Sequence, residues 1–225
     1  QLISYEIPII MVVVTVAMIP QSMNLVTIVE DQRILPYAAI MPLGFLIFLI
    51  AGVAEVGRTP FDIYFAESEV VGGPFVEYSG AHWAVFFLAE YINTFAIAAL
   101  VAILFLGGWS FPLMPDIPWL SFLWVVAKIY LVVVVIFWFR GSFPRLRIDQ
   151  LMSFGWKVLI PLSFVNLLIT AIYLFYGWPV WTSTILSVVA TFGTGFVIYR
   201  RVVTPVKQTV KERLAQARAY RSVEA

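Results

Sequence analysis

Six long apolar stretches constrain this chain more than any other feature of its sequence. Each runs for roughly 17 to 27 residues, and about 20 helical residues are enough to cross the hydrocarbon core of a bilayer. Segments such as MVVVTVAMI and IYLVVVVIF do not alternate apolar and polar residues as the strands of a membrane barrel do. We therefore predict an all-α fold, a polytopic transmembrane helix bundle with six spans in this chain. The predicted spans are residues 6–23, 36–55, 81–106, 119–139, 156–177 and 181–199.

The composition supports a membrane protein, because 62% of the residues are apolar and only 12% are charged, far from the balance of soluble domains. The first residue is Gln1, and no charged amino-terminal region or cleavage site precedes the first apolar stretch. We expect no signal peptide and a chain that begins inside a longer protein.

Basic residues are distributed unevenly between the connections. The connections after the first, third and fifth predicted spans hold only Arg33, whereas the opposite side holds twelve of the 14 Lys and Arg residues and Lys128 lies within a span. By the positive-inside rule, the side with twelve faces the cytoplasm. We predict a transmembrane domain over residues 1–200, with a cytoplasmic acidic loop at 56–80 and a basic loop at 140–155, followed by a basic cytoplasmic tail at 201–225.

The rare residue types limit the chemistry of the chain. It has no Cys and one His, which excludes disulfides, thiolate metal sites, iron–sulfur clusters and a bis-histidine haem within the chain. The sequence also lacks a glycine-rich phosphate loop and a spacing of paired metal ligands. We expect no bound metal or cofactor in this chain and no nucleic-acid partner, so any redox centres belong to partner subunits.

The segment from Glu55 to Gly80, EVGRTPFDIYFAESEVVGGPFVEYSG, holds five of the 13 carboxylates. Thr59 and Pro60 predict the start of a helix, and favourable dipole chemistry alone could account for Asp62. That explanation is weaker for Glu67, Glu69 and Glu77. The loop has one basic residue, Arg58, which could pair with Glu55, Asp62 or a partner subunit.

The ionisable residues at or within the predicted spans that bear on function are Glu6, Glu55, Glu90 and Lys128. Glu90 lies nine residues beyond Ala81, or roughly 13 Å along a helix. An unpaired charge at that depth costs at least about 2.5 to 3.5 kcal/mol. Two interpretations follow. In the first, Glu90 forms a structural ion pair with Lys128 or is locally neutral. In the second, these residues form part of a proton path.

The motifs of the chain, in their order, resemble a known family. AEVGRTPFDIYFAESEVVGGPFVEYSG, then FFLAEY and LFLGGW, closely resembles the H subunit family of NADH-quinone oxidoreductase, respiratory complex I, whose mitochondrial counterpart is chain 1. SYEIP, PLGF and FPRLRIDQLMSFGWKVLIPL resemble the same family. Members have eight or nine spans with three ahead of SYEIP, so this sequence looks like the carboxyl-terminal two-thirds.

The resemblance implies a membrane subunit of a proton-translocating NADH:quinone oxidoreductase that forms part of the quinone chamber, with quinone as the substrate. It implies FMN and iron–sulfur clusters on the partner subunits of the hydrophilic arm, small membrane-arm subunits as further partners, and a place in the bacterial inner membrane. Arg58, Asp62 and Tyr78 match the loop near the chamber, and we expect Phe61 to line it. The expected proton path comprises Glu6, Glu55, Glu67, Glu69, Glu77, Glu90 and Lys128, the glutamates because they match family positions.

One departure from the family pattern bears on these expectations. The usual PFDLPEAE is altered here, where Tyr64 and Phe65 replace the Pro-Glu pair and remove one carboxylate. The membrane subunit of hydrogenase or formate hydrogenlyase complexes is an alternative, but it typically carries His where this chain has Ser68. A stand-alone cation transporter is another, although the sequence lacks the internal repeat of many transporters.

Overall fold

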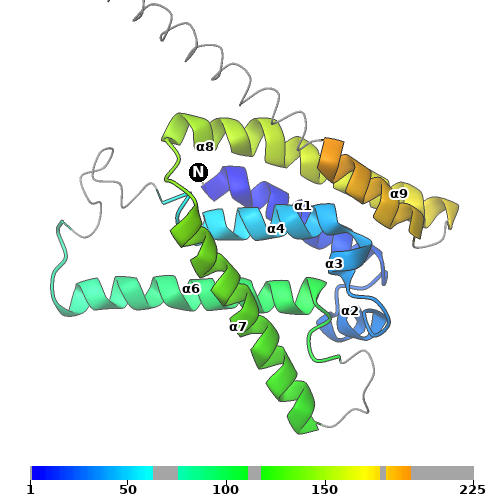
Figure 1. Cartoon of the computed structure of the whole chain (residues 1–225), viewed down its shortest axis with the longest axis horizontal. Helices are drawn as coiled ribbons and strands as arrows, with labels where there is room; N and C mark the ends of the chain where they lie inside the picture. The colour runs from blue at the N-terminus through cyan, green and yellow to red at the C-terminus, as the bar shows by residue number, and fades with distance from the viewer. Residues whose placement is uncertain (1, 63–75, 111–117, 178–180, 194–225) are drawn as a thin grey trace, which may run out of the picture.

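The computed structural model describes residues 2–62, 76–110, 118–177 and 181–193 (Figure 1). Every regular element in these ranges is helical, which confirms the predicted fold class for this part of the chain. The elements are α1 (Leu2–Met18), α2 (Leu25–Asp31), α3 (Tyr37–Ile40), α4 (Pro42–Glu55), α6 (Ala81–Phe105), α7 (Pro118–Ser142), α8 (Ile148–Phe154), the π-helix η2 (Gly155–Leu159) and α9 (Ile160–Tyr176). An apolar helix, Trp181–Gly193, follows.

Three helices are long and apolar enough to cross a membrane: Ala81–Phe105, Pro118–Ser142 and the continuous helix Ile148–Tyr176. The helices in the other three predicted spans are shorter, at 10 to 17 residues: Leu2–Met18, Pro42–Glu55 and Trp181–Gly193. A membrane protein with helical spans is therefore supported, and the number six stays a prediction.

Prolines explain where the helices depart from the predicted spans. The span predicted at 36–55 is divided at Met41 (φ −130°, ψ 70°), because the residue before a proline is disfavoured in the α region. The span predicted at 6–23 ends earlier, at Met18, shortly before Pro20. The π-helix η2 lies just before Pro161, which has no N–H to donate to a regular helix.

The basic loop predicted at 140–155 is shorter in the structure. Helix α7 continues to Ser142 and α8 begins at Ile148, so only residues 143–147 connect them. Of the helix start predicted at Thr59, Thr59 and Pro60 form a turn and Phe61 a bend, and the residues after Asp62 lie outside the described residues.

The core lies between α1, α4, α6 and α9. Helix α1 packs against α4 and α9, and α4 also contacts α6. Phe48 and Phe105, both fully buried, meet with their ring centroids 5.6 Å apart. Helix α7 packs on the outer side of α6 and crosses it steeply in Figure 1. Its outward side chains are widely exposed, for example Trp138 at 68%, as expected for a surface in an apolar environment.

Candidate functional site

The turn after α4 brings Arg58 into the protein interior. Gly57 adopts φ 68°, a conformation that glycine accepts without steric cost, and its N–H donates to the carbonyl of Ala54 at 3.1 Å. The Arg58 N–H donates to Val53, and the Phe61 N–H donates to the Arg58 carbonyl. These bonds fold the chain back on the end of α4, where Arg58 is only 5% exposed.

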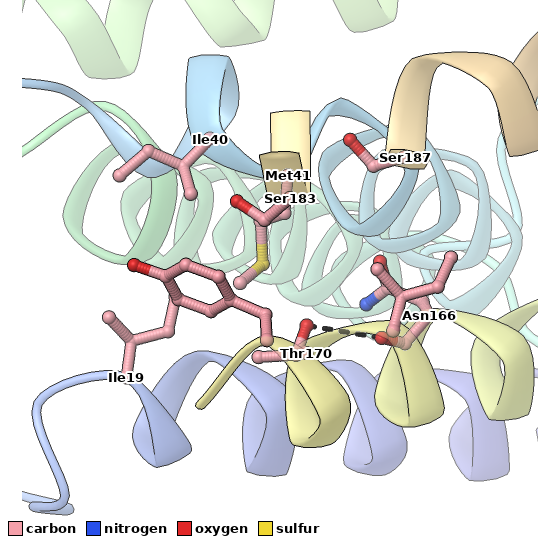
Figure 2. A pocket seen from close by; sticks show the side chains of 9 residues that line it. Ile19, Ile40, Met41, Asn166, Thr170, Ser183 and Ser187 are labelled. Atoms are coloured by element: carbon pink, nitrogen blue, oxygen red, sulfur yellow. Dashed lines mark hydrogen bonds between the residues drawn. The ribbon is translucent and has the colours of Figure 1, made fainter. Parts of the chain in front are cut away.

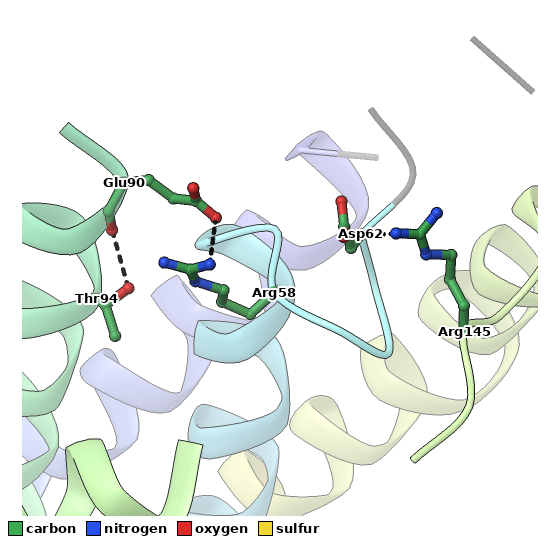
Figure 3. A network of polar contacts seen from close by, with 5 residues as sticks. All are labelled: Arg58, Asp62, Glu90, Thr94 and Arg145. Carbon is green, nitrogen blue, oxygen red and sulfur yellow. Dashed lines mark hydrogen bonds and ion pairs between the residues drawn. The ribbon is translucent and has the colours of Figure 1, made fainter. Parts of the chain in front are cut away.

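Arg58 forms a buried ion pair with Glu90 of α6 (Figure 3). Arg58 Nη1 and Glu90 Oε1 are 3.1 Å apart, and the two side chains are only 6% and 8% exposed. The guanidinium also lies 4.7 Å from the centroid of the Tyr91 ring, a cation–π distance. Among the described residues, Arg58 Nε and Nη2 and Glu90 Oε2 are buried and have no hydrogen-bond partner, so the pair has hydrogen-bonding capacity left for a ligand, a water molecule or another segment.

A second ion pair lies beside the first. Arg145 Nη2 donates to Asp62 Oδ2 at 3.0 Å, and this pair is more accessible, with side chains 44% and 14% exposed. The Leu146 N–H donates to the Pro60 carbonyl at 3.0 Å. The segments 58–62 and 143–147 are thus joined by a backbone bond and by a charged pair.

A cavity of about 280 Å³ connects these groups. Its lining combines two arginines, two carboxylates, two aromatic rings and a hydroxyl: Arg58, Thr59, Asp62, Trp83, Phe87, Glu90 and Arg140. Both Asp62 and Arg140 act electrostatically on Glu90. The cavity can therefore hold a molecule with an apolar body and polar oxygen atoms. The charged side chains that line it are close enough to influence one another electrostatically.

Phe61, which we expected to line a ligand chamber, lies in the core instead of at this cavity. It is 5% exposed, and its ring centroid is 5.5 Å from that of Tyr5 and 6.4 Å from that of Phe154. These contacts fix the turn to α1 and α8.

Among the described residues, the other predicted carboxylates do not line the cavity. Glu55 is half-buried at the end of α4, and the charge of the exposed Glu6 acts on it. Glu77 is exposed. Tyr78 is 43% exposed and packs beside Phe86, with ring centroids 5.3 Å apart. The rest of the acidic loop named above lies outside the described residues: Tyr64, Phe65, Glu67, Ser68 and Glu69.

The ion pair between Glu90 and Lys128, part of one of the two interpretations above, is wrong, because Glu90 pairs with Arg58. Lys128 Nζ donates to the carbonyls of Leu106, Gly108 and Ser110, at 2.6, 2.9 and 3.2 Å. Glu90 is nine residues from the start of α6 and Lys128 about as far from the start of α7, but the start of α7 follows the end of α6. The two depths are therefore counted from opposite ends of the packed helices.

Sequence reasoning also missed partners of the site. Arg140 and Arg145 counted only toward the charge asymmetry, and Tyr91 was not considered. The Thr94 hydroxyl, which donates to the Glu90 carbonyl at 2.9 Å, lies four residues from Glu90, a spacing that predicts this contact on any helix. No group of three or more potential metal ligands occurs in the part of the chain that the structure describes.

The fold and the site together define a helical membrane protein with a buried charge pair beside a mixed polar and aromatic cavity. The family model described as NADH dehydrogenase matches residues 1–171, and the chain belongs to this family. It is similar to the H subunit of the NADH-quinone oxidoreductase of Geobacillus kaustophilus, with 55% identity over 173 residues, and to that of Anoxybacillus flavithermus, with 51% identity over 176 residues. Each match covers 76% of this chain and 51% of the relative, so the chain spans about half the length of these relatives.

Proposed function

We propose that this chain is part of the membrane subunit of a proton-translocating NADH-quinone oxidoreductase, complex I, and that the Arg58–Glu90 cavity belongs to the wall of its quinone chamber. The buried ion pair on a 280 Å³ cavity is the observation that carries this proposal. The names of the relatives give the reaction class. A quinone has an apolar ring system and two carbonyl oxygens, which fits the aromatic rings and the guanidinium groups of the lining.

The same charges supply a means of coupling. Reduction of a quinone consumes two electrons and two protons, so it changes the local charge within reach of Arg58, Asp62 and Glu90. A carboxylate that is buried and partly neutralised responds to such a change by gaining or losing a proton. We propose that Glu90, Glu55 and Glu6 carry protons or charge coupling from the chamber into the membrane arm, together with the loop carboxylates Glu67, Glu69 and Glu77.

We leave Lys128, which we expected in this path, out of the proposal, because its ammonium is bound to carbonyls just beyond the end of α6. We assign it to helix capping.

The remaining components follow from the composition and the charge asymmetry. The chain has no Cys, so the iron–sulfur clusters belong to other subunits, and we assign the FMN to the hydrophilic arm, as the resemblance to the family implies. We place the acidic loop and the tail on the cytoplasmic side of the bacterial inner membrane, where the loop and the chamber face those subunits, and the exposed apolar helices against lipid and the small membrane-arm subunits.

Glu90→Gln in the assembled complex tests the proposal. Glutamine keeps the size of the side chain and its contact with Arg58 but cannot titrate. Arg58 keeps a hydrogen-bond acceptor in the glutamine carbonyl and its contact with the Tyr91 ring, so we expect part of the complex to assemble. In this assembled fraction, NADH-driven quinone reduction and proton pumping fall together, by about tenfold or more. NADH oxidation by an artificial acceptor that bypasses quinone serves as the measure of intact complex and stays unchanged.

Thr94→Val is the matched control, because it changes a side chain on the same face of α6 without altering a charge. We expect this variant to retain quinone reduction and pumping. Normal pumping in an assembled Glu90→Gln complex contradicts the coupling role. A parent complex that reduces quinone with hydrogen or formate, and not with NADH, contradicts the proposed reaction class.

A further inference from the structure

The last described helix, Trp181–Gly193, lies beyond residues 1–171, where the family model matches. It nevertheless packs closely on the bundle: Ser183 and Ser187 are 7% and 2% exposed, and Ala190 contacts the hydrophobic core. Figure 1 shows this helix, in orange, alongside α9. The two serines place hydroxyl oxygens on the buried face of an apolar helix, where polar groups of the neighbouring helix can reach them.

The polar partner on α9 is Asn166. It is 1% exposed, and both its Oδ1 and its Nδ2 lack a hydrogen-bond partner among the described residues. An added Cβ at Gly44 of α4 would lie 3.0 Å from Asn166 Nδ2, so the glycine provides the space for the amide. Fully buried amide groups in proteins normally have partners, which makes this side chain an exception that needs an explanation.

A small cavity lies at the amide (Figure 2). Its volume is about 10 Å³, the size of one water molecule. It is lined by polar groups of both helices and by apolar side chains of the preceding segments: Ile19, Ile40, Met41, Asn166, Ile169, Thr170, Tyr173, Ser183 and Ser187. Figure 2 shows the amide of Asn166 directed toward the space between these side chains.

The hydrogen bonds already formed determine what the cavity can accept. The Thr170 hydroxyl donates to the Asn166 carbonyl at 3.1 Å, and the Ser187 hydroxyl donates to the Thr184 carbonyl at 2.9 Å. Their protons are committed, so these two oxygens offer only lone pairs to the cavity. Asn166 Oδ1 needs a donor and Nδ2 needs an acceptor. One molecule with two donors and two acceptors meets all of these requirements, and that molecule is water.

We propose that a single buried water bridges Asn166 to the hydroxyls of α9 and of the Trp181–Gly193 helix, and that this hydrated contact fixes the last helix to the bundle. The water accepts from Asn166 Nδ2 and donates to Asn166 Oδ1 and to a hydroxyl oxygen. The inference concerns the docking of this helix and is independent of the quinone chemistry proposed above.

A map of the intact complex at a resolution that shows buried waters tests the site directly. We expect a density peak within hydrogen-bonding distance of the Asn166 amide. An empty cavity in a map that resolves other buried waters overturns the proposal.

Amide hydrogen exchange over residues 181–193 tests the docking role in the same complex. With Asn166→Leu or Ser187→Ala, the bridge loses an anchor, and we expect exchange in this helix to accelerate roughly fivefold or more. Val189→Ala is the matched control on the same helix, at a position 61% exposed, and should leave exchange within about twofold. If the amide were dry, Asn166→Leu would remove a buried unpaired group and slow the exchange, so slower or unchanged exchange in this variant also overturns the proposal.

Discussion

At the scale of single residues, the unusual feature is the buried ion pair of Arg58 and Glu90, because charged side chains are rarely buried in an apolar helix bundle. Burying two ions is costly, and their mutual attraction offsets that cost only when both are present and well placed. Arg58 has a second support in the Tyr91 ring, 4.7 Å from its guanidinium. A planar guanidinium stacks on a ring in a way that a lysine ammonium does not reproduce, which explains why this position requires Arg for more than its charge.

This reasoning predicts a non-additive response to substitution. Arg58→Met leaves Glu90 as an unpaired buried charge, and we expect a loss of about 3 to 5 kcal/mol in stability and a large fall in the yield of assembled complex. Arg58→Met combined with Glu90→Gln removes both charges, so assembly should recover while quinone reduction stays low. Yield by native gel and turnover per assembled complex measure the two effects.

The Arg145–Asp62 pair provides the control, because the Arg145 side chain is 44% exposed. An accessible pair contributes only about 0 to 1 kcal/mol, so Arg145→Met should assemble nearly normally. A double variant no better assembled than Arg58→Met alone would show that the charge pair is not what limits stability.

At the scale of elements, the two ends of α6 have different tasks. Its first half carries Glu90, and its far end is fixed by side chains from other elements. Gln32 Nε2 donates to the carbonyls of Ile103 and Leu104, each at 3.2 Å, and Lys128 binds the carbonyls that follow. Helix ends leave carbonyls without intrahelical partners, and here the buried Gln32 and the half-buried Lys128 bind the carbonyls at and just beyond this end.

The sequence predicted the helices well and their partners poorly. Apolar stretches specify helices because the pattern is local, and Pro20 and Pro42 explain the boundaries that were missed. The Glu90 partner could not be derived in this way, since Arg58 reaches it only through the positive φ of Gly57 and the packing of α4 on α6. We expected Phe61 at a chamber because an aromatic side chain in a polar loop can line a ligand site. The same side chain can equally well pack in the core, where the structure places it.

Lys128 gives a prediction at this scale. Lys128→Leu removes the donor for three carbonyls, and we expect a lower thermal midpoint and a reduced yield of the complex, because each buried unsatisfied group costs about 1 to 3 kcal/mol. Lys128→Gln keeps an N–H donor and loses the charge. In the fraction of this variant that assembles, the ratio of protons pumped to quinone reduced should equal that of the parent.

The pumping ratio separates helix capping from proton transfer. A lowered ratio in assembled Lys128→Gln complexes would return Lys128 to the proton path. Ser121→Ala, at a half-buried position near the start of α7, serves as a control for substitution in this helix and should match the parent in both midpoint and ratio.

At the scale of the whole molecule, the predicted topology depends on whether the segment of α3 and α4 crosses the membrane. Helix α4 has 14 residues, or roughly 21 Å of helix, against a hydrocarbon core of about 30 Å. Helix α3 precedes it across the break at Met41, and the two together cover the length of the predicted span at 36–55. The predicted topology includes a crossing by this segment, because it assigns Arg33 and the acidic loop to opposite sides.

Labelling of single cysteines tests this topology, and the chain contains no native Cys to interfere. Ile34 precedes α3 and is 87% exposed, and Ser79 follows the acidic loop and is exposed. With a membrane-impermeant thiol reagent, we expect Ser79→Cys and Ser222→Cys to react only from the cytoplasmic side and Ile34→Cys only from the other side. Ile34→Cys and Ser79→Cys on the same side would mean that the segment 36–55 re-enters without crossing. Ser79→Cys and Ser222→Cys on opposite sides would mean an odd number of spans after the loop, because an even number, four in the predicted topology, brings the basic tail back to the side of the acidic loop.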